Sequence, residues 1–428
     1  LGEAQRLDVA VDARDAALAV ASAHAPIFDD KGLEAALALA PGDLAAQAWI
    51  TLSTRVTARG PGRSARALAA LERAHERAAT PIMRGEVLVR LGRFADAAAV
   101  LRGRVDDEVV GPAARLWLAA ARHDAAEAQG ELTKPLVEDV VAALDAVIAR
   151  DPTLFDAWRL RGVWRAQLDD REAVADVTRA CQLAHPTFAA EAAQLAGEVL
   201  YGFASWEEAV RRFDEALALD ADLFLSRKRR AFSRMALENW RGAIDDFERL
   251  EQGLGRSDVD VIKGLIEARL AVGERAGVRD QLERRRQLEP SATTDIWSAG
   301  VLAETGDLAT AEGRLGEVLA GDAADAEARG LALSLRVRIR VERGDARAAL
   351  ADAEELTALE PGSARAHAFM ALARVAAGDP AHARRTARAP TDGRCFAACP
   401  RWPLHRGNGY DGHTVIWWRP VAPALRAA

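Results

Sequence analysis

The chain contains few lysines, cysteines and aromatic residues, and each shortage narrows the classes of protein it can belong to. Lysine is found only at positions 31, 134, 228 and 263, which leaves 53 of the 57 basic residues as arginine. Together with the abundance of alanine, this bias predicts a bacterial protein encoded by GC-rich DNA. Its three cysteines, Cys181, Cys395 and Cys399, are too few for a disulfide framework, so we expect a reducing, cytoplasmic compartment.

Long apolar runs and blocks of like charge are also missing. No uncharged apolar segment is long enough to cross a membrane, so we predict no membrane partner. The net charge is −7, from 57 basic and 64 acidic side chains mixed along the chain, which argues against nucleic acid as a partner. Half of the residues are hydrophobic but only 5% are aromatic, a composition typical of helices packed closely through small side chains.

Signatures of catalysis are missing too. The sequence has no phosphate-binding loop GxxxxGK[ST], no GxSxG, no HExxH and no protein-kinase signature. Its histidines are scattered singly. The carboxylate pairs Asp169–Asp170 and Asp245–Asp246 are expected at helix starts, turns or outer faces, where they favour the helix dipole or solvent. We therefore predict that the chain is not an enzyme and has no catalytic residue, metal or cofactor.

What the chain does have is an internal repeat. The segment SWEEAVRRFDEALALDAD aligns with NWRGAIDDFERLEQ, so that Ala209 falls on Ala243 and Phe213 on Phe247, each 34 residues later. Apolar residues within the first segment recur at helical spacing. A side chain no larger than a methyl group lets two helices cross closely, and a large ring one turn later fills the wedge to the next pair of helices.

Each unit of the repeat pairs this helix with a preceding one. The segment Phe188–Tyr201 is also helical in pattern and holds Gly197 twelve residues before Ala209. Another unit carries Trp158 and Gly162 at the fourth and eighth places. A 34-residue helical hairpin with Gly or Ala at the eighth place, Ala at the twentieth and Phe at the twenty-fourth resembles the tetratricopeptide repeat.

This resemblance implies an all-α fold. The expected architecture is an α-solenoid, a right-handed superhelix of stacked hairpins, because no single hairpin buries its apolar stripe alone. We expect degenerate hairpins over residues 1–80, the tetratricopeptide-like array over residues 81–389 and an irregular tail over residues 390–428. Because the chain opens at Leu1 without methionine, we also expect residues upstream of it.

The composition of the tail differs from that of the array. Its 39 residues hold five of the 16 prolines and carry a net charge of +3. Cys395, Cys399, His405 and His413 are of types that bind zinc, but their spacing departs from the usual ligand patterns, so we predict no zinc site. Out-of-frame translation of GC-rich DNA would give such a composition, and we expect little packed structure here.

The resemblance also implies a binding surface. In the family, the first helix of each hairpin lines a concave groove, and its second, fifth, ninth and twelfth places point inward. These places hold Lys228, Phe232 and Met235 in one unit and Lys263 in the next, with Arg229 beside them. The lysines resemble part of a carboxylate clamp, although its asparagines are replaced. We predict an acidic or mixed acidic–apolar peptide as the partner; a solvated basic face is the alternative.

These observations predict a non-catalytic scaffold that binds a protein or peptide partner in the groove of the array. The alternative is a C-terminal accessory or regulatory region of a larger bacterial enzyme. Hairpins of the form AWRLRGVWRAQL look like those that follow the Ser/Thr protein kinase domain in some multidomain bacterial proteins. The sequence does not specify the partner.

Overall fold

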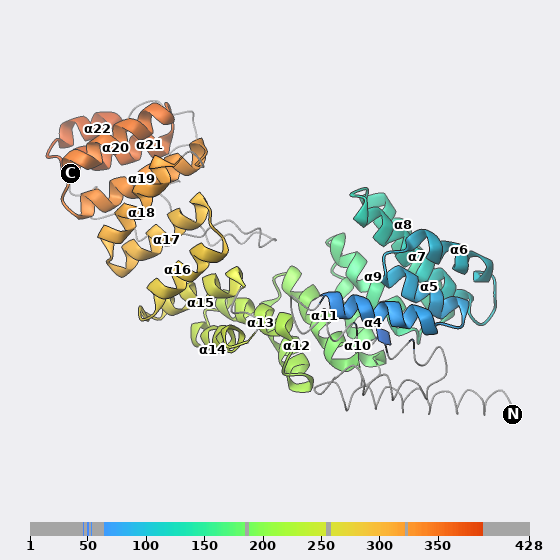
Figure 1. The fold of residues 1–428 in the computed structure, drawn as a ribbon. Helices are drawn as coiled ribbons and strands as arrows, with labels where there is room; N and C mark the ends of the chain where they lie inside the picture. Colours follow the sequence, from blue (N-terminus) through green and yellow to red (C-terminus); the bar gives the residue numbers. More distant parts are fainter. Residues whose placement is uncertain are drawn as a thin grey trace. The chain divides into compact units, whose positions relative to one another are not determined.

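The computed structural model describes residues 46, 49, 50, 53, 64–184, 188–253, 258–321 and 324–387. The predicted tail and most of the predicted N-terminal hairpins lie outside these residues. The all-α class is confirmed, because the regular structure in the described residues consists of helices alone (Figure 1). None of these helices is both long and apolar enough to cross a membrane.

The helices are α4 (Ser64–Arg77), α5 (Pro81–Arg90), α6 (Phe94–Leu101), the 3-10 turn η1 (Arg102–Arg104), α7 (Gly111–Ala128), α8 (Lys134–Arg150), α9 (Phe155–Gln167), α10 (Ala173–Leu183), α11 (Ala189–Gly202), α12 (Trp206–Leu219), α13 (Phe224–Ala236), α14 (Trp240–Glu251), α15 (Val259–Ala271), α16 (Val278–Leu288), α17 (Ala292–Thr305), α18 (Leu308–Ala320), α19 (Ala326–Glu342), α20 (Ala346–Leu359), α21 (Ala364–Ala376) and α22 (Pro380–Ala387).

The chain divides into two compact units, Leu1–Ala268 and Arg269–Ala428. In the first unit, successive helices pack as hairpins, α5 with α6, α7 with α8, α9 with α10, α11 with α12 and α13 with α14. In the second, α17 packs with α18, α19 with α20 and α21 with α22. We call the first helix of a hairpin its A helix and the second its B helix. Each A helix also packs against the next A helix of its unit, so each unit is an α-solenoid of stacked hairpins.

Glycine on the A helix allows the B helix to approach closely. In α11/α12, a Cβ added to Gly197 would lie 2.5 Å from the ring of Phe213, and in α9/α10 one added to Gly162 would lie 2.7 Å from Val177. Real Cβ atoms do not approach other atoms this closely, so only hydrogen fits at these two places. Ala209 and Phe213 are fully buried. The small–large pair of the sequence is thus the contact that closes this hairpin.

The second ring of the repeat, Phe247, is also fully buried but reaches the next A helix. Its ring lies against Gly264 on α15. It also meets Phe232 edge to face, with ring centroids 5.1 Å apart, a preferred geometry for aromatic pairs. Phe247 therefore fills the space between its own hairpin and the following helix.

Three hairpins add a buried ionic network to this packing. In α13/α14, Asp246 is 1% exposed and accepts hydrogen bonds from Arg230 at 2.5 and 2.9 Å and from Arg234 at 2.7 Å. These arginines lie one helical turn apart on the A helix, and Arg230 also donates to Asp214 of the preceding B helix at 2.6 Å. The same arrangement recurs with Arg161 and Arg165 around Asp176, and with Arg336 and Arg340 around Asp352.

The prediction that Asp245 and Asp246 both favour solvent or the helix dipole is therefore wrong for Asp246. Asp245 is exposed, but Asp246 follows Ala243 by three residues and so shares its buried helix face. The A helix supplies two arginines there, and a buried carboxylate is tolerated when it is paired and hydrogen-bonded. The pair Asp169–Asp170 does lie in a turn, between α9 and α10.

Candidate functional site

Polar side chains form a continuous surface over neighbouring A helices of the first unit. The fifth, ninth and twelfth places of α11, counted from its close-contact glycine as the eighth, hold Gln194, Glu198 and Tyr201. On α13, Lys228 takes a groove place and Arg229 lies beside it, over the ring of Tyr201. We call these five residues the A-helix face.

Arg229 connects α13 to α11 across this face. Its guanidinium carbon lies 4.8 Å from the ring centroid of Tyr201, the geometry of a cation–π interaction. Tyr201 in turn meets Trp206 edge to face, with ring centroids 5.1 Å apart. Burial raises the pKa of Tyr201, so its phenol stays protonated at neutral pH. Arg229 is thereby held against α11 by an uncharged ring.

Glu198 is a carboxylate whose charged form the chain stabilises incompletely. Burial raises the pKa of Glu198, while the charge of Arg229 and a hydrogen bond with Gln194 act in the opposite direction without cancelling the shift. The carbonyl oxygen of Gln194 also accepts a hydrogen bond from the Ser226 hydroxyl at 2.9 Å, which fixes the amide between α11 and α13. A further cation near Glu198 would therefore be stabilising.

Lys228 takes its groove place but is already paired within the chain. Its ammonium donates to Asp258 at 2.9 and 3.0 Å and to Asp260 at 2.8 Å, at the start of α15. Its side chain is only 15% exposed. Because two carboxylates neutralise the one ammonium, Lys228 gives this surface no surplus positive charge. The prediction of an acidic partner stays untested, and these contacts remove its main support.

The other groove residues predicted from the sequence are placed differently from Lys228. Phe232 is 8% exposed and packs on Phe247, and Met235 is 9% exposed, so both side chains contribute to packing around α13. Lys263 is half-buried on α15 and makes no ion pair with any described residue. Its predicted fifth place on α15 stays a prediction.

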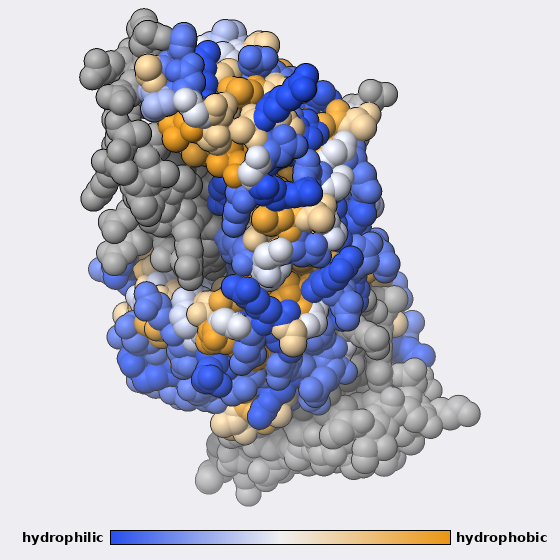
Figure 2. All heavy atoms as spheres, turned by 90° about the vertical axis from the view of Figure 1, so that its left-hand side faces the viewer, coloured by the Kyte–Doolittle hydropathy of each residue, from blue (hydrophilic) through white to orange (hydrophobic). Residues whose placement is uncertain are grey.

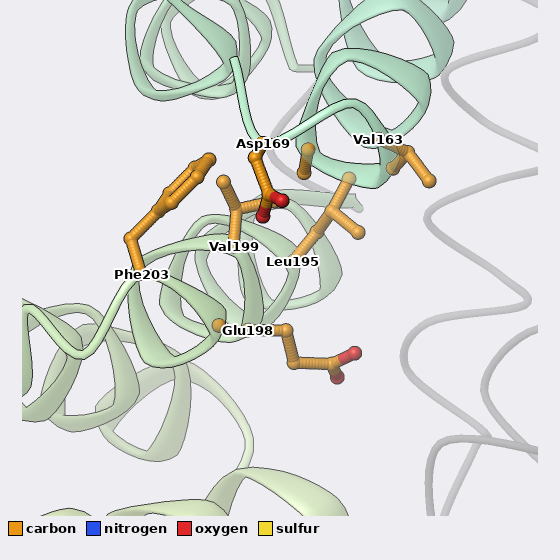
Figure 3. Close-up of a pocket in the computed structure, with 8 residues that line it drawn as sticks. Val163, Asp169, Leu195, Glu198, Val199 and Phe203 are labelled. Carbon is orange, nitrogen blue, oxygen red and sulfur yellow. The ribbon is translucent and has the colours of Figure 1, made fainter. Parts of the chain in front are cut away.

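A small pocket lies between α9 and α11, next to the A-helix face (Figure 3). Its volume is about 230 Å³. In Figure 3 the carboxylate of Asp169 points toward Leu195 and Val199. The side chain of Glu198 extends away from the Asp169 carboxylate. The pocket is lined by Val163, Ala166, Asp169, Leu195, Glu198, Val199, Gly202 and Phe203.

Asp169 reaches this pocket from a left-handed turn, a conformation that recurs in the later turns at Ala204, Glu238 and Gly273. It lies in the turn after α9 with φ of 58°, in the left-handed region that aspartate adopts more readily than most residues. Its side chain is exposed and forms no ion pair or hydrogen bond with any described residue. The pocket therefore has an apolar floor and an unpaired carboxylate at its edge.

Sequence reasoning missed Glu198, Tyr201 and Asp169 as site residues. The counting rule that selected Lys228 on α13 would have selected Glu198 and Tyr201 on α11, since Gly197 marks the eighth place there. Asp169 occupies the turn place that Ala204, Glu238 and Gly273 occupy in later hairpins, but the residue type at that place does not indicate that its side chain reaches a pocket.

One group of side chains has the composition of a metal site. Ligand atoms of His123, Asp124 and Glu127 lie within 4.8 Å of one another. Both imidazole nitrogens are already engaged, Nδ1 with Asp124 and Nε2 with Gln167, each at 2.9 Å, and the ring stacks on Trp164. Burial acts to lower the pKa of His123, but these hydrogen bonds outweigh it and raise the pKa. The contacts fit a packed, hydrogen-bonded histidine better than a metal ligand.

The large exposed apolar side chains of the described residues are spread over several elements. On the face shown in Figure 2, orange apolar groups occur as separate patches among hydrophilic ones. Scattered exposed apolar residues are ordinary on protein surfaces. The large ones are spread over different helices and turns: Leu68, Val109, Leu219, Leu288 and Leu359.

No family model and no curated protein matches the chain. Solved structures similar to it include tetratricopeptide repeat proteins. The C-terminal part of one from Cytophaga hutchinsonii is 17% identical, with a TM-score of 0.47, over 55% of this chain and 94% of that chain. A thermophilic one from Thermus thermophilus is 22% identical, with a TM-score of 0.35, over 44% of this chain and 99% of that chain.

A human IFIT1 dimer with PPP-AAAA is also similar. It is 13% identical, with a TM-score of 0.40, over 83% of this chain and 84% of that chain. At such scores the assignment of the fold rests on the hairpin contacts described above.

Proposed function

We propose that the chain is a non-catalytic scaffold that binds an extended peptide or protein segment along the A-helix face. The observation that carries this proposal is the continuity of that face. Arg229 on α13 contacts Tyr201 on α11, and Lys228 reaches Asp258, just before α15, and Asp260 in its first turn. Stacked hairpins present such neighbouring A-helix positions as an extended surface, which suits a partner longer than a small molecule.

The chemistry of the pocket beside the face supports a binding role over a catalytic one. Its lining offers two carboxylates but no histidine, cysteine, serine or lysine. A nucleophile with its base, or an acid–base pair with converging geometry, would be needed for catalysis, and Asp169 and Glu198 extend in different directions. Apolar walls with a few charged groups are typical of recognition.

Position-specific photo-cross-linking of the full chain tests this proposal. A photoreactive residue replaces Gln194 on the A-helix face, and a control chain carries it in place of Arg211, an exposed residue of the B helix α12. In extract from the source organism, we expect the same protein to be labelled repeatedly from position 194 and not from position 211. Equal labelling from both positions, or labelling from 211 alone, would contradict the proposal.

A further inference from the structure

We infer that the pocket between α9 and α11 receives the side chain of a lysine or arginine of the bound partner. This inference rests on the proposed function, since it names the chemistry of a residue that a peptide on the A-helix face would insert. It reverses the charge expected for the partner from the sequence. Three observations lead to it: the size of the pocket, its apolar walls and its carboxylates.

The size of the pocket suits one side chain. Pockets that enclose a small-molecule ligand or cofactor usually measure about 300–1,000 Å³. The present pocket, at about 230 Å³, is smaller than that range. It lies directly beside Glu198 of the A-helix face, so a peptide on that face could insert a single residue without leaving it.

The walls suit a side chain with an apolar stem. Val163 comes from α9, Leu195 and Val199 come from α11, and the ring of Phe203 closes one end (Figure 3). Lysine and arginine lay their methylene stems along apolar surface while the charged head stays at a polar edge. An aspartate or glutamate has a shorter stem and would bring its charge toward these walls.

The charges select a cation. The lining residues include the acidic Asp169 and Glu198 and no positively charged residue. The Asp169 carboxylate points toward the apolar walls, while Glu198 lies at the margin of the pocket and its side chain extends away from the Asp169 carboxylate. Asp169 is unpaired among the described residues, and Glu198 is only partly compensated by Arg229. An incoming ammonium or guanidinium would supply the missing opposite charge, and hydrogen bonds to charged groups are among the stronger ones in proteins.

Three arginines of the chain lie near the pocket, but none of them lines it. Arg171 is exposed, and its guanidinium carbon lies 5.7 Å from the ring centroid of Phe203. Arg165 is engaged by Asp176 at 3.0 Å and by Glu172 at 3.2 Å. Arg229 is held on the ring of Tyr201. None of these arginines lines the pocket.

The test selects random-sequence peptides, displayed on phage, against the full chain and then measures selected peptides by fluorescence anisotropy. We expect the selected peptides to share a lysine or arginine. Acetylating that lysine, or replacing an arginine by citrulline, removes the charge but keeps the stem. Binding should weaken at least about tenfold, the factor that corresponds to losing one hydrogen bond to a charged group.

Two variants of the chain complete the test. Glu198→Gln and Asp169→Asn remove the charges with almost no change in shape, and asparagine also tolerates the left-handed backbone at position 169. We expect the double variant to lose about the same factor as the uncharged peptide, while the control Glu208→Gln, on the exposed face of α12, binds like the parent. Circular dichroism confirms that each variant is folded.

Different results would overturn the inference of a basic partner residue and the proposed function. Selected peptides that carry no shared basic residue, or that keep their affinity for the double variant, overturn the inference. If those peptides still cross-link from position 194 and not from position 211, the proposed function stands. If they cross-link only from position 211, the proposed function fails together with the inference.

Discussion

The hairpins α11/α12 and α13/α14 share the same repeat spacing but close their interfaces with different chemistry. In α11/α12 the ring of Phe213 lies directly on Gly197, an apolar contact with no room for a Cβ. In α13/α14 a buried carboxylate, Asp246, is bound by two arginines of the A helix. The repeat spacing thus fixes which positions of the two helices are in contact. The residue types at those positions decide whether the contact is apolar or ionic.

This difference also decides which polar residues of α11 and α13 remain on the A-helix face. Because α11 uses glycine and a ring for its packing, its polar residues Glu198 and Tyr201 remain on the face. On α13, Arg230 and Arg234 turn inward to Asp246, and Arg227 lies 3.6 Å from the same carboxylate and donates to the carbonyl of Ala221. Lys228 and Arg229 remain on the A-helix face. The basic run SRKRR is therefore mostly structural, which its sequence does not reveal.

Removing the buried carboxylate should have the largest effect on the ionic hairpin. Asp246→Ala leaves the charges of Arg230 and Arg234 without their buried partner, and we expect a loss of about 3–5 kcal/mol in the stability of this hairpin. The control is Asp245→Ala, which removes the exposed neighbouring carboxylate. Urea denaturation followed by circular dichroism compares the two midpoints. Equal midpoints would show that the network is dispensable.

Removing the ring should cost about as much in the apolar hairpin. Phe213 is fully buried, and Phe213→Ala leaves a cavity beside Gly197, so we expect a loss of about 3–5 kcal/mol. Leu219→Ala, at the exposed end of the same helix, serves as the control. Because repeat arrays can unfold in stages, amide hydrogen exchange of α11 and α12 should localise the loss. Unchanged exchange there would contradict the packing account.

Replacing the small residue Ala209 by a larger one should reduce the stability less than the two changes above. Ala209 is fully buried on α12, and Ala209→Leu forces extra methylene groups into the hairpin, at an expected cost of about 1–3 kcal/mol. Ala218→Leu adds the same groups on the exposed side of α12 and should change the denaturation midpoint little. A larger loss from the exposed change than from the buried one would refute the assigned helix orientation.

The smallest expected effect is a pH dependence of peptide binding. Burial raises the pKa of Glu198 in the free chain, and a bound cation lowers it because it favours the ionised carboxylate. Affinity for a lysine peptide should therefore be full above the raised pKa and fall as the pH drops through it. Anisotropy titrations at a series of pH values measure this. The fall should be smaller in Glu198→Gln, and an identical profile in both chains would rule Glu198 out.

The sequence predicts the hairpin contacts well because they depend on size alone. Gly197, Ala209 and Phe213 are separated by fixed numbers of residues, and a helix places such residues on one face. The ionic network was not predicted, because whether Asp246 faces solvent or arginine depends on the partner helix. For the same reason the pairing of Lys228 with Asp258, 30 residues later, left no periodic signal.

The candidate site was predicted only in its general position. Counting from the repeat put Lys228 on the right face, but the same count treated Phe232 and Met235 as open to a partner, whereas the packing around α13 buries both. The carboxylates of the pocket come from two different local structures, a helix and a left-handed turn. Their combination depends on how α9 and α11 stack, which one sequence does not specify.

The most direct test of the central claim is hydrogen–deuterium exchange of the full chain with and without a selected lysine-containing peptide. The A-helix face and the pocket predict slower exchange in α9, α11 and α13 when the peptide is bound, with α10, α12 and α14 unchanged. Protection confined to the B helices, or absent from all of these helices at saturating peptide, would contradict the claim that the A helices form the recognition surface.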